Sequence, residues 1–364
     1  MHYRELDTPA LFIDLDILGR NLDTMARYCG KHSLGLRPHT KTHKMLEVAR
    51  MQLAHGAIGL TVAKVGEAEV MSASGATEIL IAYPVFGEKK SERLARLAGE
   101  RKILVSIDSE VTARGLSKVL SHQGVSLGVL VEVDVGVGRC GLPPGPKTVA
   151  LAREIGRLPG LDFRGLMTFF GNVWGNLEER EKAIGEVTSQ LEQACEAFRR
   201  EKIPLEIVSG GSTPSAPLTH GVKDLTEIRP GTYVFNDMNT YHQDSCRLDD
   251  CAARVVATVV STAVPGQVIL DAGSKTLTSD PLGSGPATGH GLVVEAPHSQ
   301  LFKLNEEHGY LRLSPEDPAF KVGDTVTVIP NHVCPCVNLH DEVFTVRNEE
   351  VVGSWQVAAR GKVR

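Results

Sequence analysis

The sequence predicts an α/β fold, with an N-terminal (β/α)8 TIM-like barrel followed by a C-terminal antiparallel β domain. Short apolar stretches alternate with helical patterns about eight times in the first ~240 residues, which is the count and size of such a barrel. These stretches are almost continuously apolar, as parallel strands buried on both faces are. Near Arg247 the pattern changes to short β-rich segments broken by Gly and Pro.

The expected elements of the first region follow one another at regular intervals. A doubly wound sheet is the structural alternative, but the regular repeat and the lack of GxGxxG after the first strand disfavour it. Strands are predicted at 10–14, 34–36, 57–62, 78–83, 103–108, 127–135, 163–169, 205–208 and 225–228. Helices are predicted at 15–29, 44–55, 64–74, 88–97, 109–122, 146–158 and 177–200.

The change of pattern divides the chain into two expected domains. The barrel is predicted to span residues 8–246 and the β domain residues 247–364, with residues 1–7 packing on the β domain. No helix beyond a single turn is expected in the second domain. Its strands are predicted at 254–262, 267–271, 291–294, 310–313, 325–329, 342–347 and 351–357.

Composition narrows the class of protein. The 364 residues carry a net charge of −5 and only 5% aromatic side chains, which argues against nucleic-acid binding. No apolar run is long enough to predict a membrane span, and residues 1–5 lack the apolar core of a signal peptide. The seven cysteines are an odd number scattered through a large chain, which favours a reducing cytoplasm over a disulfide framework.

A basic cluster at residues 37–44 (Arg-Pro-His-Thr-Lys-Thr-His-Lys) follows the predicted strand at 34–36. Barrel enzymes place their chemistry at such carboxyl ends of strands. Neighbouring positive charges and partial burial would lower the pKa of Lys41 and make its amine a nucleophile. His39 and His43 are candidate proton acceptors or, alternatively, pack against Lys41 and orient it. The whole cluster could instead form a basic surface loop.

Later strand ends supply residues suited to an anionic ligand. The loop at 134–141 combines glycines with Arg139, a permanent cation that could face a ligand oxygen. Two further loops resemble phosphate nests, and as late barrel loops they occupy the usual phosphate position. The alternative for both is a tight turn. The residues concerned are Gly211, Ser212, Thr213, Gly231, Thr232 and Tyr233.

The β domain contains a His-x-Cys pair, His332 and Cys334. On an extended strand these side chains would share one face and could bind one metal ion, with zinc favoured by the imidazole and thiolate. A buried free cysteine is the alternative. Cys336 could compete as a ligand, although Pro335 is expected to bend the strand between them.

A nucleophilic lysine, a phosphate cradle and an arginine together indicate pyridoxal 5'-phosphate (PLP), which needs a lysine anchor and a phosphate nest. Tyr83, at another strand end, could stack near the cofactor ring or pack in the core. The motifs at 8–10, 37–44, 82–84, 134–141, 210–214 and 330–341 resemble the D-threonine aldolase / D-serine dehydratase family, the alanine racemase-like, fold-type III PLP enzymes.

The resemblance runs from about residue 8 to 361 and implies the roles of individual residues. Lys41, not Lys44, matches the Schiff-base lysine, and Arg139 matches a residue that approaches the phenolic oxygen of PLP. Gly211, Ser212 or Thr213, with Gly231 and Thr232, would hold the phosphate. His332 and Cys334 match ligands of a divalent metal (Zn, Mn or Mg). A homodimer is also implied.

The implied function is a lyase acting on small-molecule D-β-hydroxy-α-amino acids, as an aldolase that releases glycine and an aldehyde. A D-serine dehydratase-type elimination is the alternative, because the cysteine at position 334 is typical of dehydratases, whereas residues 337–341 and 357–361 look more like the aldolase branch. An amino-acid racemase and a non-catalytic PLP-carrying protein are the other classes. A racemase would need a second acid/base group, and the metal pair argues against the non-catalytic class.

Overall fold

The structure is a computed structural model that describes residues 1–282 and 289–364. The chain divides into two compact units. The barrel unit comprises Thr24–Lys41, Leu46–Gly231 and Gly361–Arg364, and the β unit comprises Met1–Asp23, Thr42–Met45 and Thr232–Arg360. The expected boundary at 246/247 therefore differs from this division, which places residues 8–23, 42–45 and 232–246 with the β unit.

The barrel unit is built on eight parallel strands. Along the sheet the order is β2 (Gly35–Leu36), β9 (Glu227–Ile228), β8 (Ile207–Gly210), β7 (Leu161–Met167), β6 (Leu127–Glu132), β5 (Lys102–Ile107), β4 (Glu78–Ile81) and β3 (Leu60–Val62). A parallel bridge between His39 and Thr61, just beyond β2, links the two ends of this order. The Thr61 N–H also donates to the Pro38 carbonyl at 2.8 Å, so the sheet closes into the predicted TIM-like barrel.

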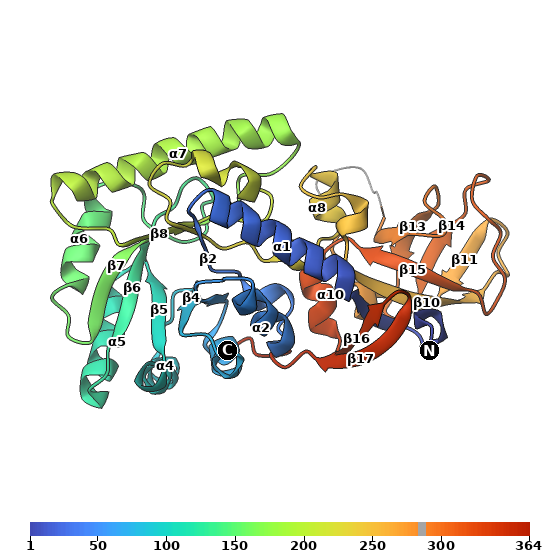
Figure 1. The fold of residues 1–364 in the computed structure, drawn as a ribbon, viewed down its shortest axis with the longest axis horizontal. Helices are drawn as coiled ribbons and strands as arrows, with labels where there is room; N and C mark the ends of the chain where they lie inside the picture. Colours follow the sequence, from blue (N-terminus) through green and yellow to red (C-terminus); the bar gives the residue numbers. More distant parts are fainter. Residues whose placement is uncertain (283–288) are drawn as a thin grey trace. The chain divides into compact units, whose positions relative to one another are not determined.

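Helices cover the outside of the barrel, as Figure 1 shows for the helices beside β5, β6 and β7. In chain order they are α2 (Leu46–Ala54), α3 (Val65–Met71), α4 (Glu88–Glu100), α5 (Glu110–Gln123), α6 (Pro146–Ile155) and α7 (Leu177–Arg200). Local sequence sets their ends. Ser109 caps α5 by accepting the Thr112 N–H, and Gly124 ends it in the left-handed conformation with φ 66°. Val187, Leu191 and Phe198 form the buried stripe of α7 at helical spacing.

The interior of the barrel changes from apolar to polar along the strands. Leu80, Leu104, Leu130, Met167 and Ile207 form one apolar cluster, one residue from each of five strands. Two residues further along β5 and β6, Ser106 donates to the buried Glu132 at 2.7 Å. Polar side chains therefore face inward toward the carboxyl ends of the strands, where the predicted site residues follow.

The β unit contains a nine-stranded sheet with the path β13-β14-β11-β10-β1-β16-β17, while β15 pairs with β10 and β12. The strands are β1 (Ala10–Asp14), β10 (Ala253–Ser261), β11 (Gln267–Leu270), β12 (Gly291–Val293), β13 (Gln300–Leu304), β14 (Gly309–Arg312), β15 (Thr325–Pro330), β16 (Glu342–Arg347) and β17 (Glu350–Gln356). Antiparallel pairs dominate, as predicted, but β1 pairs in parallel with β16.

The assignment of residues 10–14 to the barrel was wrong. Phe12 of β1 pairs with Arg254 and Phe344 of the β unit, and its side chain packs with Tyr3, Val256 and Val346. A short buried strand carries no local signal of its partners, since these lie more than 200 residues away in the chain. Tyr3 and Leu6 belong to the same cluster, so residues 1–7 pack where they were expected to.

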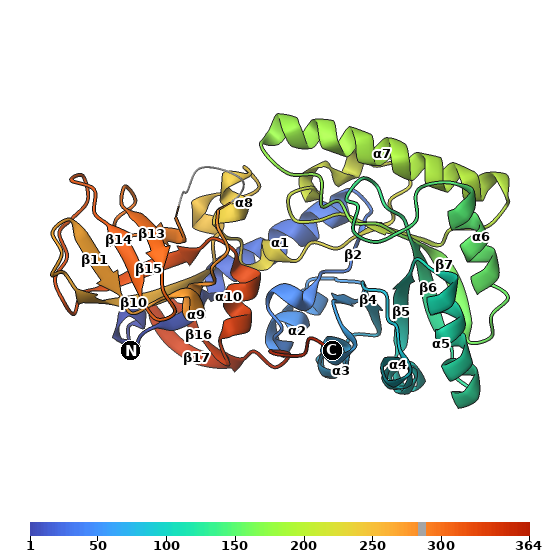
Figure 2. The ribbon, with the colours of Figure 1, turned by 180° about the vertical axis from the view of Figure 1, so that it is seen from behind.

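Short helices complete the β unit, and the one at Val333–Leu339 is longer than the single turn that was expected there. They are α8 (Met238–His242), α9 (Ser274–Leu277) and α10 (Val333–Leu339), and α9 contacts α10 (Figure 2). Helix α1 (Leu15–Lys31) begins in the β unit and ends in the barrel unit. Within the described residues, no helix is long and apolar enough to cross a membrane.

Candidate functional site

The 37–44 cluster separates into a structural part and an available part. Arg37 is buried and donates two hydrogen bonds of 2.9 Å to Glu227 of β9, and it forms an ion pair with Glu78 of β4 at 2.9 Å. Lys44 is buried and donates to Asn338 Oδ1 at 2.7 Å. Lys41 is exposed. Of the two lysines, Lys41 is therefore the one whose amine a ligand can reach.

These contacts correct the physical reason given for the reactivity of Lys41. Carboxylates neutralise Arg37, Lys44 is held by an amide, and the side chain of Lys41 is not partly buried. Burial within the chain therefore does not account for a reactive amine at this position. What singles out Lys41 is its position, in the single 3-10 turn Thr40–Thr42 beyond β2, at the carboxyl end of the barrel.

The two histidines of the cluster differ in their surroundings. His39 is part of the bridge that closes the barrel, and its Nδ1 accepts the backbone N–H of Lys41 at 3.3 Å. His43 is completely buried, accepts the Met45 N–H on Nδ1 at 3.1 Å and lies edge-on to Phe235. The packing alternative is therefore favoured for His43, whereas His39 adjoins Lys41 directly.

The two predicted phosphate loops follow β8 and β9, the seventh and eighth strands of the barrel in chain order. Gly211 has φ 80°, and a Cβ there would lie 3.2 Å from the side chain of Ile228. Ser212 and Ser215 fix the turn, because the Ser212 N–H donates to Ser215 Oγ at 2.8 Å. Gly231, which follows β9, is buried. This compact glycine turn fits a phosphate, since a side chain at position 211 would displace its neighbours.

The predicted phosphate-binding residues belong to two different units of the chain. Thr213 is buried and belongs to the barrel unit with Ser212, whereas Thr232 and Tyr233 begin the β unit. Thr232 Oγ1 lies 3.8 Å from the Cys334 sulfur, a contact that the sequence did not predict. Tyr233 is buried in the 3-10 turn Thr232–Val234.

The Arg139 loop is held by a carboxylate. Asp134 Oδ1 accepts the N–H groups of Gly136, Val137 and Gly138 at 2.9–3.1 Å, so the loop after β6 is a closed turn rather than an open strand. The guanidinium of Arg139 lies over the ring of Phe169, 4.5 Å from its centroid. Tyr83, after β4, is 44% exposed and carries the Lys64 ammonium over its ring. The core-packing alternative for Tyr83 was therefore wrong.

Sequence reasoning missed a buried cation. Arg229 directly follows β9 and donates at 2.6 Å to Ser209 Oγ and to the Thr168 carbonyl. Burial lowers the pKa of Arg229 to about 10 and raises the pKa of the Glu132 carboxyl. The sequence feature that could have identified Arg229 is its position two residues before Gly231, at the strand end next to a predicted phosphate loop. A guanidinium held beneath such loops favours an anionic ligand.

His332 and Cys334 lie at the start of a helix, and the expectation of an extended strand was wrong. His332 is the N-cap residue of α10, and Cys334 lies in its first turn. The helix also explains Cys336, which is buried and donates its S–H to the Thr276 carbonyl at 3.2 Å. It therefore does not compete with Cys334 as a ligand.

Despite the helix, the two predicted metal ligands contact each other and a carboxylate. Burial alone would lower the pKa of His332, but hydrogen bonds to Cys334 and Asp280 outweigh it and raise that pKa to about 9. The distance from His332 Nδ1 to Asp280 Oδ2 is 2.7 Å, and Thr42 Oγ1 lies 3.2 Å from the Cys334 sulfur. A carboxylate on one ring nitrogen leaves the other oriented for a metal, an arrangement typical of histidine ligands.

A second carboxylate supports the helix that carries this pair. Asp237 Oδ2 accepts the Val333 N–H at 3.0 Å, and Asp237 also caps α8 by accepting the Thr240 N–H. Burial raises the pKa of the Asp237 carboxyl. No group of three or more His, Cys, Asp or Glu side chains with metal-binding geometry occurs in residues 1–282 and 289–364. His332 and Cys334 supply an imidazole and a thiol, which are donors that fit a divalent metal such as zinc.

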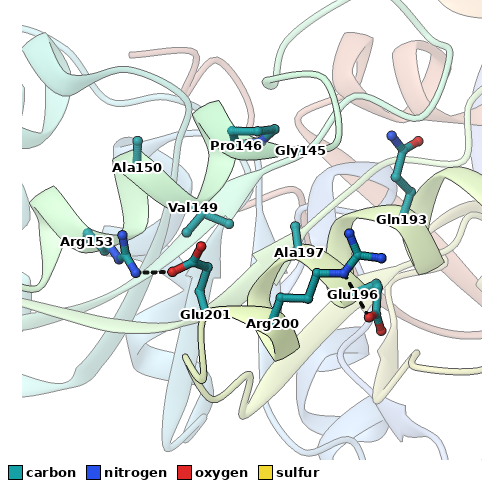
Figure 3. A pocket seen from close by; sticks show the side chains of 10 residues that line it. All are labelled: Gly145, Pro146, Val149, Ala150, Arg153, Gln193, Glu196, Ala197, Arg200 and Glu201. Carbon is teal, nitrogen blue, oxygen red and sulfur yellow. Dashed lines mark hydrogen bonds and ion pairs between the residues drawn. The ribbon is translucent and has the colours of Figure 1, made fainter.

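A groove of about 520 Å³ lies elsewhere on the barrel unit, between α6 and α7 (Figure 3). Val149 and Ala197 form part of its floor, and ion pairs of Arg153 with Glu201 and of Arg200 with Glu196 flank it. None of the predicted site residues lines this groove. The candidate site is accordingly formed by strand-end loops and not by this helix–helix groove.

Known proteins resemble the chain over nearly its whole length. The family model described as "Alanine racemase, N-terminal domain" matches residues 13–238, and "Putative serine dehydratase domain" matches residues 252–346. A D-threonine aldolase from Arthrobacter sp is 35% identical over 360 residues, 98% of this chain and 93% of the relative. The chain belongs to the D-threonine aldolase / D-serine dehydratase family of alanine racemase-like, PLP-dependent lyases.

Two further members of this lyase family show its range. The D-threo-3-hydroxyaspartate dehydratase of Delftia sp. (strain HT23) is 34% identical over 359 residues, covering 90% of this chain and 91% of the relative. A crystal structure of D-threonine aldolase from Filomicrobium marinum superposes with a TM-score of 0.92 at 34% identity and covers 100% of this chain and 98% of that one. The family thus includes both carbon–carbon cleavage and elimination.

Proposed function

We propose that this lyase cleaves D-β-hydroxy-α-amino acids of the D-threonine type to glycine and an aldehyde, with PLP on Lys41 and a divalent metal at His332 and Cys334. Two observations carry the proposal: Lys41 is an exposed lysine at a strand end of the barrel unit, and His332 and Cys334 of the β unit form a pair braced by Asp280. The relatives that are D-threonine aldolases support this choice of reaction.

The bound groups supply two kinds of chemistry. PLP withdraws electrons from the α-carbon of an amino acid joined to it, and a divalent metal polarises the substrate β-oxygen. The residues of the chain bind and orient these groups. Lys41 Nζ would anchor the cofactor, the Gly211–Thr213 turn and Gly231 would hold its phosphate, and Arg139 would provide a cation for a cofactor oxygen.

Proton transfer separates the possible reactions. In carbon–carbon cleavage the first proton leaves the β-hydroxyl, and His39 is the candidate acceptor because it adjoins Lys41, whereas His43 is completely buried. In an elimination the first proton leaves the α-carbon, and the released amine of Lys41 is the candidate base. The same side chains therefore support either reaction, depending on which proton leaves first.

A D-serine dehydratase-type elimination is the second candidate, and Cys334 favours it. A thiolate is a soft ligand that selects zinc, and Cys334 contacts His332 in the structure. The 34% identity to a D-threo-3-hydroxyaspartate dehydratase supports the same alternative.

One assay distinguishes these reactions. Purified protein would be incubated with PLP, Mn²⁺ or Zn²⁺, and either D-threonine or D-serine, while glycine, aldehyde and 2-oxo acid are measured. Glycine with aldehyde is the expected result for the aldolase, and 2-oxo acid with ammonia is the result for a dehydratase. Formation of the L-enantiomer alone would indicate a racemase. Absence of turnover with every β-hydroxy D-amino acid, unaffected by chelator, would refute the proposed lyase activity.

A further inference from the structure

Two cysteines of the β unit form a close pair outside the candidate site. Cys246 follows α8, and Cys251 lies at the end of the 3-10 turn Leu248–Asp250, just before β10. Their thiols interact with each other, and neither cysteine is in a disulfide. The Cys246 sulfur also lies 3.6 Å from Thr240 Oγ1. Neither residue takes part in the proposed lyase reaction.

The backbone holds one member of the pair in place. Asn21 and Asn236 both donate to the Asp250 carbonyl, at 2.8 and 3.2 Å, and Arg254 donates to the Cys251 carbonyl at 3.0 Å. The Cys251 side chain is completely buried with Met238 and Ile329. Cys251 is therefore a fixed, protected thiol.

Cys246 has the opposite character. It is partly exposed, whereas Cys251 is completely buried. The hydrogen bond from Cys251 lowers the pKa of the Cys246 thiol, whereas burial raises the pKa of Cys29 to about 11 and that of Cys195 to about 12. A partly exposed thiol of lowered pKa next to a protected thiol is the arrangement of a reactive and a resolving cysteine.

We propose that Cys246 and Cys251 are a redox-active dithiol that hydroperoxides oxidise to an intramolecular disulfide. The Cys246 thiolate attacks the terminal oxygen of the hydroperoxide, the O–O bond breaks, and a sulfenic acid and water (or an alcohol) result. The Cys251 sulfur then attacks the Cys246 sulfur, the S–O bond breaks, and a second water leaves with the Cys251 proton. Two thiols are oxidised for each hydroperoxide reduced.

The short chain segment between Cys246 and Cys251 favours formation of the disulfide. Residues 247–250 separate the two cysteines, so closing the ring costs little chain entropy. The turn is already formed, since the Cys251 N–H donates to the Leu248 carbonyl at 3.1 Å and the Arg247 N–H to Asp250 Oδ2 at 2.8 Å. The backbone that joins the two cysteines is thus already ordered in the structure.

Peptide mapping of the full-length protein tests the proposal. Reduced protein would be treated with hydrogen peroxide, alkylated and digested with trypsin without reductant. Cleavage after Arg247 separates the two cysteines, so the disulfide would join peptide 224–247 to peptide 248–254, with the loss of two hydrogen atoms. Free thiol should fall by two per chain at the first equivalents of peroxide.

Variants identify the reactive sulfur. Cys251→Ala should leave a sulfenic acid on Cys246 that dimedone labels, and Cys246→Ser should leave Cys251 unmodified because Cys251 is buried. Cys195→Ala, which removes a buried cysteine of α7, is the matched control and should form the disulfide at the wild-type rate. Recovery of both peptides separately alkylated after excess peroxide would overturn the proposal, as would a sulfinic acid on Cys246 without the linked peptide.

Discussion

The strand-end loops of the barrel and the His332 corner, which consists of His332, Cys334 and Asp280, are both candidate ligand sites. The chain forms these two sites in different ways. In the barrel, each residue follows its own strand, and the backbone pairing of parallel strands brings their carboxyl ends together. The His332 corner instead depends on side chains, because Asp280 and Cys334 orient the imidazole and Asp237 holds the helix. A site of the first kind can be read from sequence spacing, whereas the second requires distant contacts.

The largest effect is expected for Lys41→Ala, which removes the barrel site's covalent anchor. Activity should fall by more than about 10⁴-fold, since binding and proton transfer are both lost. The visible absorbance of protein-bound PLP should disappear as well. Lys44→Met is the matched control, because Lys44 is held by Asn338, and it should retain that absorbance. Persistent colour and activity in Lys41→Ala would mean that another lysine is the anchor.

The next largest effect is expected for a substitution of Cys334, which should affect the metal site without affecting PLP binding in the barrel. Cys334→Ala should lower activity by about 1000-fold, because a metal polarising the substrate oxygen contributes several kcal/mol. PLP absorbance should not change, since the barrel site does not need this thiol. Cys334→Asp should bind metal again but prefer Mn²⁺ or Mg²⁺ to Zn²⁺, as a harder ligand does. Metal content per chain measures both variants, and unchanged metal content in Cys334→Ala would exclude Cys334 as a ligand.

A smaller effect is expected in the phosphate loop. Gly211→Ala should weaken PLP binding by about tenfold, because φ of 80° costs a residue with a Cβ on the order of 1–2 kcal/mol. Gly221→Ala is the matched control, since no atom lies within 4 Å of a Cβ at that position. Titration of cofactor-free protein with PLP compares the two variants. Equal affinities would show that the Gly211 turn does not hold the phosphate.

The smallest effect concerns the polar layer of the barrel. Burial raises the pKa of Glu132 above its unfolded value of 4.5, so the folded chain holds this proton more tightly than the unfolded chain. Its stabilisation is fully present below that value and is lost as the pH rises through the folded pKa. Glu132→Gln should remove this pH-dependent contribution from the free energy of unfolding. Urea unfolding from pH 4 to pH 8 measures it, and identical pH profiles would contradict the assignment.

The two regions also differ in how far the sequence could predict them. Continuous apolar strands and helix caps such as Ser109 act locally, so the barrel and the order of its loops were predictable. Three features were not. Phe12 belongs to the β unit through pairs with residues 254 and 344, the His332–Cys334 segment is helical because Asp237 caps its first N–H, and Asp280 meets His332 across 52 positions. Each of these features depends on residues that are distant in the chain, which a local sequence pattern cannot identify.

The role of Lys41 as cofactor anchor is the central claim, and borohydride trapping tests it most directly. Protein loaded with PLP would be reduced with sodium borohydride, digested and mapped by mass spectrometry. We expect a phosphopyridoxyl group on Lys41 and none on the buried Lys44. A phosphopyridoxyl group on Lys44, Lys64 or any other lysine, with Lys41 unmodified, would contradict it.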